Sequence, residues 1–185
     1  MPLGPDHLTP NFKITELTKT SSPHANVPTA EARCALKALC SAVLEPLREK
    51  VGRLEITSGY RSPLVNQDAG GSRSSQHLRG EAADLRPMDH DRLGAWLILV
   101  EMIEAGLPVD QAILYETTTH VHVSHTARRV ARRSIRVFTQ QGTFEPWATF
   151  RDLPDLEARF NREAGFSRGG PTLDPERLPH PPDDE

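Results

Sequence analysis

Ser58-Gly59-Tyr60-Arg61-Ser62 is the first of three segments around which the rest of the chain is organised. The second is Ser-Gln-His-Leu-Arg-Gly-Glu-Ala-Ala-Asp at residues 75–84, and the third is His-Val-His-Val-Ser at residues 120–124. Histidine and valine alternate in the third segment, which is typical of a β-strand that carries both imidazoles on one face. Together the three segments predict one metal site with substrate-holding side chains beside it.

Histidine and aspartate in the second and third segments are ligands that zinc prefers. A catalytic zinc site uses three protein ligands and leaves a fourth position for water. His77 and Asp84 would supply two ligands, and one histidine of the pair His120 and His122 would supply the third. Gly80 allows the chain between His77 and Asp84 to turn back around a metal. A His-x-His pair alone is more often an ordinary polar face of a strand, so the prediction depends on all three segments.

Two further charged residues could act beside a metal ion at such a site. Glu116 shares a face with both histidines if the strand continues unbroken, and its carboxylate could then take a proton from the attacking water. Arg61 could bind a carboxylate through two parallel hydrogen bonds or polarise a carbonyl group.

The pattern Ser-x-His-x-x-Gly-x-Ala-x-Asp followed by His-x-His resembles the zinc D-Ala-D-Ala carboxypeptidase family of metallopeptidases, and especially its bacterial and phage members. The resemblance extends over roughly residues 8–145. Residues 115–124 are also similar to the zinc-site segment of the Hedgehog amino-terminal signalling domain, which shares this peptidase-like fold. We therefore expect an α+β fold in which a small, mainly antiparallel sheet carries the zinc site and helices pack outside it.

Carried over by position, the resemblance implies that His77, Asp84 and His122 hold Zn²⁺. It also implies that Arg61 binds the carboxylate or carbonyl oxygen of the substrate and that Ser75 lies close by.

The resemblance identifies the catalytic base less directly than it identifies the metal ligands. Several family members carry an acidic residue three positions before the last histidine ligand, where this chain has Thr119. The Hedgehog-like pattern instead has a glutamate six positions before it, which is Glu116, so Glu116 is taken as the base. His120 would then support the metal ligands or donate a hydrogen bond to the tetrahedral intermediate.

The implied activity is that of a zinc metallopeptidase that hydrolyses peptidoglycan stem peptides next to D-alanine, as a D-Ala-D-Ala carboxypeptidase does. One alternative is a cross-bridge endopeptidase of a phage or prophage, although the sequence shows no cell-wall-binding repeat. The other is a catalytically silent zinc-binding module of the same fold, against which Glu116 and Arg61 argue.

Length and composition set further bounds. The chain has 185 residues, a net charge of -3 and hydrophobic and charged shares of 37% and 25%, which suit one globular domain. We expect a peptidase domain over residues 1–164 and a Pro-, Gly- and acid-rich tail over residues 165–185. We expect a monomer without nucleic-acid or membrane partners, since the charge is negative and no apolar run approaches about 18 residues. The first residues lack a signal-peptide pattern, so we expect synthesis in the cytoplasm and action on the cell wall after phage-mediated release.

Apolar residues at three- and four-residue spacing predict a helix from a Thr29 cap to about Lys50, interrupted near Pro46. Cys34 and Cys40 fall in this helix and are expected to be reduced thiols in or near the core, because they lie on different helix faces.

The remaining elements follow from similar patterns. Strands are predicted at residues 54–58, 111–115 and 135–138, and a flexible loop at 66–75. A helix is predicted to end at Ala105, with Trp96 in the core rather than stacked on a sugar. Its inner face is expected to comprise Leu93, Trp96, Leu97, Val100 and Ile103. Five arginines between residues 127 and 137 are interpreted as a solvated loop, and residues 153–162 as a short helix.

Overall fold

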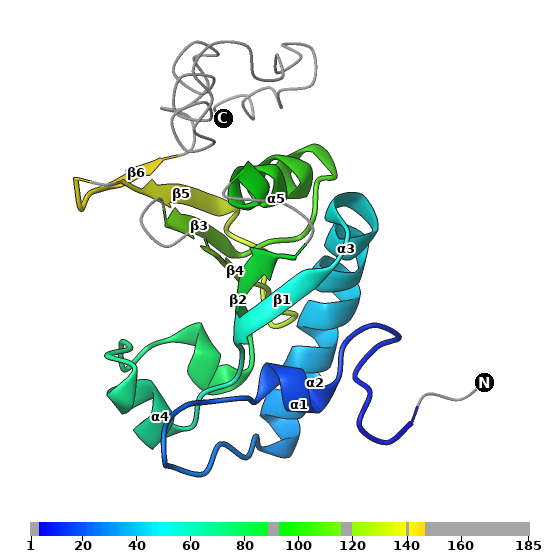
Figure 1. Ribbon diagram of the computed structural model, residues 1–185, viewed down its shortest axis with the longest axis vertical. Coiled ribbons are helices and arrows are strands. Elements are labelled where there is room, and N and C mark those ends of the chain that lie inside the picture. The colour runs from blue at the N-terminus through cyan, green and yellow to red at the C-terminus, as the bar shows by residue number, and fades with distance from the viewer. Residues whose placement is uncertain (1–3, 89–92, 116–119, 140, 147–185) are drawn as a thin grey trace.

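The computed structural model describes residues 4–88, 93–115, 120–139 and 141–146 (Figure 1). The helices are α1 (Ile14–Leu17), α2 (Ala30–Leu39), the π-helix η1 (Cys40–Leu44), α3 (Glu45–Val51), α4 (Pro63–Asp68), the 3₁₀ helix η2 (Gln76–Arg79) and α5 (Leu93–Glu104). The strands are β1 (Leu54–Ser58), β2 (Ala82–Pro87), β3 (Gln111–Tyr115), β4 (His120–Ser124), β5 (Ser134–Phe138) and β6 (Phe144–Pro146).

The six strands form one sheet in the order β1-β2-β4-β3-β5-β6. Neighbouring strands are antiparallel except β3 and β5, which are parallel. The predicted α+β class with a mainly antiparallel sheet is therefore confirmed. None of the helices in the described ranges is long and apolar enough to cross a membrane.

One face of the sheet packs on helices and forms the core. Val121 and Val123 of β4 are fully buried on this face, as their alternation with histidine predicted. Helix α5 lies against β2, β3 and β4 and contacts α3 (Figure 1). Because α5 is apolar on nearly every side, its spacing did not reveal the inner face. Trp96 is in the core as predicted, but Leu97, Val100 and Ile103 are only partly buried, and the side chain of Leu93 lies outside what the structure describes. The other residues of α5 described as buried are Ala95, Ile98, Leu99 and Met102.

The helical segment over residues 30–51 changes its winding near Pro46, as the position of this proline predicted. The Thr29 hydroxyl caps α2 by accepting a hydrogen bond from the Ala32 amide at 3.2 Å. Pro46 has no amide hydrogen to donate within a helix, and the preceding turn is wound as the π-helix η1 before α3 begins. Four leucines of this segment are fully buried, and each contributes about 1.5–3 kcal/mol to folding; they are Leu36, Leu39, Leu44 and Leu47.

Both cysteines are free thiols, as predicted, but they lie in different environments. Cys40 is buried, and this burial raises the pKa of its thiol to about 12. Cys34 is exposed, so the prediction that it lies in or near the core was wrong.

The strands predicted at residues 54–58 and 111–115 are confirmed, and the third begins at Ser134. The prediction of a loop over residues 66–75 was partly wrong, because residues 66–68 form the last turn of α4. Asn66 is buried there and donates hydrogen bonds to the carbonyls of Gly71 and Ser72. The predicted tail and the helix at residues 153–162 lie outside the described residues.

Candidate functional site

The sheet register brings a carboxylate and an imidazole together. Asp84 of β2 lies opposite His122 of the antiparallel strand β4, and η2 places His77 beside both. Nδ1 of His122 lies 2.9 Å from Oδ1 of Asp84 and 3.2 Å from Nε2 of His77. Nε2 of His77 lies 3.3 Å from the same Asp84 oxygen. All three potential ligand atoms are within 4.8 Å of one another, so this cluster could hold a metal ion.

The first sequence segment orients the His77 ring. Nδ1 of His77 donates a hydrogen bond to the carbonyl of Gly59 at 2.6 Å, which leaves the lone pair of Nε2 directed at the cluster. The amide of Arg61 donates to the His77 carbonyl at 3.1 Å, so the same segment also holds the backbone of η2. These two contacts hold residues 58–62 beside His77, although His77 lies at least 15 positions later in the chain.

Gly59 is required by a close backbone approach. A Cβ atom added at residue 59 would lie 2.3 Å from the Leu17 carbonyl oxygen, which already accepts a hydrogen bond from the Tyr60 amide at 2.7 Å. Because this obstacle is backbone, a side chain at residue 59 must displace either α1 or the carbonyl that orients His77.

The Gly59→Ala protein should lose about 1–3 kcal/mol of unfolding free energy through overpacking and bind zinc about tenfold more weakly through the displaced carbonyl. Chemical denaturation and competition with a zinc chelator measure the two effects. Gly4→Ala is the matched control, because an added Cβ there makes only an ordinary contact, 3.5 Å from Nδ1 of His7, and both the unfolding free energy and the zinc affinity should stay close to the wild-type values. Unchanged zinc affinity in Gly59→Ala would contradict the role of this carbonyl.

The charge states of the cluster suit metal binding. Burial alone would raise the pKa of the Asp84 carboxyl, but its close contacts with the His122 and His77 imidazoles outweigh it and hold this pKa well below its usual range. Burial lowers the pKa of His122, although Asp84 opposes the shift, so the imidazole is neutral near pH 7. A carboxylate and neutral imidazoles are the protonation states that coordinate zinc. The residues present therefore fit a zinc ion.

Arg61 supports the Asp84 carboxylate. Its Nη2 donates to Oδ2 of Asp84 at 2.7 Å, and its Nε donates to the hydroxyl of Ser58 at 2.8 Å. The Asp84 carboxylate thus turns one oxygen to the imidazoles and the other to the guanidinium. Arg61 also lines the cleft described below, so part of its hydrogen-bonding capacity faces the space where a substrate would lie.

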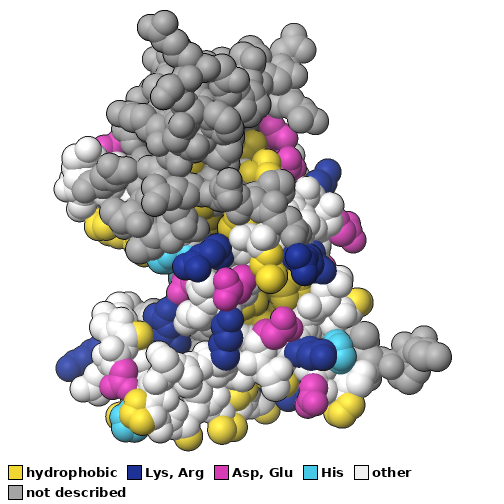
Figure 2. Space-filling model, in the orientation of Figure 1, with side chains coloured by type: hydrophobic (Ala, Val, Ile, Leu, Met, Phe, Trp, Pro, Cys, Tyr) yellow, Lys and Arg dark blue, Asp and Glu magenta, His cyan; other side chains and the backbone are white. Residues whose placement is uncertain are grey.

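A cleft of about 620 Å³ opens on the side of the sheet opposite α5. Figure 2 shows a hollow on the left of the view with histidine and basic side chains beside it. Ser75 lines the cleft and also caps η2, because its hydroxyl accepts a hydrogen bond from the His77 amide at 3.3 Å. The cleft therefore brings together Arg61, Ser75, His77, Asp84, His120 and His122.

His120 lies on the cleft but outside the three-residue cluster. Its ring stacks on Tyr115 of β3, with ring centroids 4.7 Å apart. Burial lowers the pKa of His120, so its imidazole is neutral near pH 7 and can accept a proton. Glu116 and Thr119, the two positions considered for the base, lie outside the described residues.

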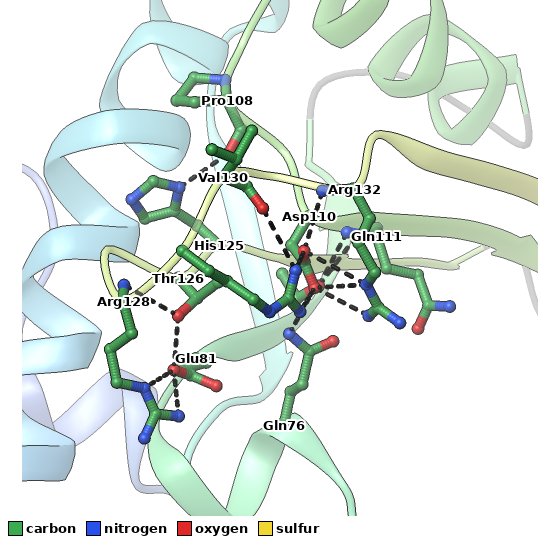
Figure 3. Close-up of polar contacts among 12 residues, drawn as sticks. Gln76, Glu81, Pro108, Asp110, Gln111, His125, Thr126, Arg128, Val130 and Arg132 are labelled. Carbon is green, nitrogen blue, oxygen red and sulfur yellow. Dashed lines mark hydrogen bonds and ion pairs between the residues drawn. The ribbon is translucent and has the colours of Figure 1, made fainter.

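The five arginines of residues 127–137 are exposed and lead into β5 as interpreted, but three of them also bind two buried acidic residues, which the sequence did not reveal. Glu81 accepts hydrogen bonds from Arg128 and from the hydroxyl of Thr126. Asp110 is fully buried and accepts from both Arg129 and Arg132 (Figure 3). Periodicity cannot find such pairs, because their members are 19 to 47 positions apart.

Asp110→Asn is expected to lower the unfolding free energy by about 2–3 kcal/mol, less than a wholly buried ion pair because the arginines are half-exposed. Burial raises the pKa of Asp110, but hydrogen bonds from Arg132 and Arg129 outweigh it and lower the pKa. A lowered pKa stabilises the fold above the unfolded value of about 3.9, and this contribution is lost as the pH falls. Denaturation at pH 7 and pH 3 should therefore show a smaller difference between the two proteins at pH 3; an equal difference would contradict this assignment.

Comparison with known proteins places the chain in a family. The family model described as Peptidase M15 matches residues 10–124, which contain α1 to β4 and all three residues of the cluster. A search of curated proteins gives no match. Because the matched region is well over half of the chain, the protein belongs to the Peptidase M15 family of metal-dependent peptidases.

Proposed function

We propose that this protein is a zinc peptidase that hydrolyses the stem peptide of peptidoglycan at a bond next to D-alanine, in the manner of a D-Ala-D-Ala carboxypeptidase. The observation that carries the proposal is the cluster of His77, Asp84 and His122 at the wall of a cleft that Arg61 also lines. Peptide hydrolysis needs an activated water and a group that recognises the substrate, and this arrangement provides for both.

His77, Asp84 and His122 are the proposed zinc ligands. Three protein ligands leave one coordination position open, which distinguishes a catalytic zinc site from a closed structural one. A zinc ion held there would lower the pKa of water to about 7 and polarise the scissile carbonyl. The Gly59 carbonyl and the Arg61 guanidinium fix the orientation of His77 and Asp84, respectively, before substrate binds.

The other cleft residues act on the substrate. Arg61 binds the terminal carboxylate of the peptide with the part of its guanidinium that faces the cleft. Glu116 takes the proton from the attacking water and passes one to the leaving amine. His120, which faces the cleft from β4, donates a hydrogen bond to the oxyanion of the tetrahedral intermediate. Arg61 would thus bind the terminal carboxylate and His120 the oxyanion, at two separate points of the cleft.

The test uses mass spectrometry of defined stem-peptide fragments incubated with the zinc-loaded protein. Release of one alanine from a fragment ending in D-Ala-D-Ala supports the carboxypeptidase, and cleavage of a cross-linked fragment alone would make the protein an endopeptidase. Absence of any product from either fragment would favour a zinc-binding module without catalysis. Release of the protein to the cell wall, where this substrate lies, belongs to the same proposal.

A further inference from the structure

The cleft continues past the zinc-ligand cluster to a pair of arginines held by a buried carboxylate. Nη1 and Nη2 of Arg129 donate to Asp110 at 2.6 and 2.8 Å, and Nη2 of Arg132 donates to it at 2.8 Å. Gln76 completes the set, since its Nε2 donates to Asp110 at 3.0 Å. Figure 3 shows Gln76 and Arg132 pointing toward Asp110. Arg129, Arg132 and Gln76 all line the cleft, whereas Asp110 has no exposed surface.

The charges in this part of the cleft do not balance. Two guanidinium groups share the single negative charge of Asp110, so one positive charge remains. Both arginine side chains are about half-exposed, at 46% and 50%. Among the described residues, neither Nε of Arg129 nor Nη1 of Arg132 donates a hydrogen bond. Asp110 thus holds the two guanidiniums in place without saturating them.

The arginine pair has a fixed position relative to the zinc-ligand cluster. Gln76 is adjacent to His77 in η2, and the Asp110 amide donates to the Ser124 carbonyl at 2.7 Å at the end of β4. Ile113 of β3 is paired with His122 of β4. Asp110 precedes Ile113 by three residues, so it lies about 10 Å from the level of His122 along the strand direction. An extended peptide covers this distance in about three residues.

We propose that Arg129 and Arg132 form a second carboxylate-binding subsite, which recognises a carboxylate of the peptide substrate about three residues from the bond that is cleaved. This inference rests on the proposed function and specifies its substrate as an acidic peptide. A guanidinium pair presents planar N–H groups that match a carboxylate, and a preorganised pair loses little freedom on binding. Both arginines follow residue 124, where the family match ends, so the match assigns them no role.

The experiment uses synthetic peptides ending in D-Ala-D-Ala that carry either a carboxylate or a carboxamide at the second, third or fourth residue from the scissile bond. Isothermal titration calorimetry on the full chain, with and without zinc, measures each dissociation constant. The wild-type protein should bind one of the carboxylate peptides about tenfold more tightly than its carboxamide partner. Equal binding of each pair at all three positions would overturn the subsite.

Matched variants identify the residues responsible. Arg129→Gln and Arg132→Gln each leave one arginine to neutralise Asp110, which protects the fold, and each should lower the tenfold preference to about twofold. Arg132→Lys keeps the charge but not the planar fork and should retain part of the preference. Arg133→Gln removes an adjacent exposed arginine outside the cleft and should keep the full preference. An undiminished preference in both Arg129→Gln and Arg132→Gln would overturn the assignment.

Failure of this inference is distinguishable from failure of the proposed function, because the titrations without zinc measure binding in the absence of cleavage. Preferential binding of a carboxylate peptide that is never cleaved would retain the subsite and reject the peptidase. Cleavage of carboxylate and carboxamide peptides with equal kcat/KM and equal affinity would retain the peptidase and reject the subsite.

Discussion

The Asp84→Asn protein is expected to lose its bound metal and at least about 10³-fold in kcat/KM. The substitution removes the negative charge that both imidazoles and the Arg61 guanidinium contact. The guanidinium would then lie beside two imidazoles and an amide with no carboxylate to offset its charge, an arrangement that repels a divalent cation. Inductively coupled plasma mass spectrometry of the dialysed protein gives the metal content, and peptide assays give the rate.

Asp68→Asn is the control for this prediction. It makes the same chemical change at an exposed aspartate of α4 that bonds the Ser22 hydroxyl, outside the zinc-ligand cluster. Metal content and kcat/KM should equal those of the wild type. A stoichiometric metal content in Asp84→Asn would contradict the assignment of Asp84 as a ligand.

The Glu116→Gln protein is expected to retain zinc but to lose about 10²–10⁴-fold in kcat. Glutamine keeps the shape of the side chain and can still hydrogen-bond water, but it cannot accept a proton at neutral pH. Substrate binding through Arg61 is unaffected, so KM should change little and the loss should appear in kcat. Steady-state kinetics on a cleaved stem-peptide fragment, together with metal analysis, separates this outcome from the loss of metal expected for Asp84→Asn.

His120→Gln provides the comparison. If His120 only stabilises the oxyanion, a glutamine amide can still donate a hydrogen bond, and kcat should fall less than in Glu116→Gln. A wild-type kcat in Glu116→Gln together with a large loss in His120→Gln would transfer the role of base to the imidazole, whose lowered pKa permits it.

The strands and their faces could be predicted from the sequence because they depend on local alternation. The period of two at residues 120–124 places the valines in the core and the histidines on the opposite side, and the structure has this arrangement. The cluster of His77, Asp84 and His122 was anticipated from three spaced segments, but its geometry depends on the pairing of β2 with β4. Side-chain spacing within one segment does not determine which strands pair.

Contacts between distant segments could not be predicted. Nothing near Gly59 in the sequence indicates that it must lie against the Leu17 carbonyl, 42 positions earlier in the chain. The arginines after residue 127 were interpreted as solvated because each one, considered alone, is an ordinary surface cation. Their pairing with buried carboxylates was missed. Their partners Glu81 and Asp110 become buried only when β2 and β3 enter the sheet, and a buried carboxylate requires a cation. The missed part of the cleft is thus the part built from long-range ion pairs.

Asp84 and His122 both lie on interior strands of the sheet, since β2 and β4 each have a neighbour on both sides. Interior strands open only when the whole domain unfolds, whereas edges and loops open by local fluctuation. A ligand held between such strands adds its binding free energy to global unfolding, by about 4 kcal/mol at a concentration 1,000 times its dissociation constant. Removing the ion should therefore speed amide hydrogen exchange throughout the central strands rather than only around Asp84 and His122. A bound ion would then stabilise every residue that unfolds cooperatively with the central strands. Hydrogen exchange followed by mass spectrometry would identify those residues.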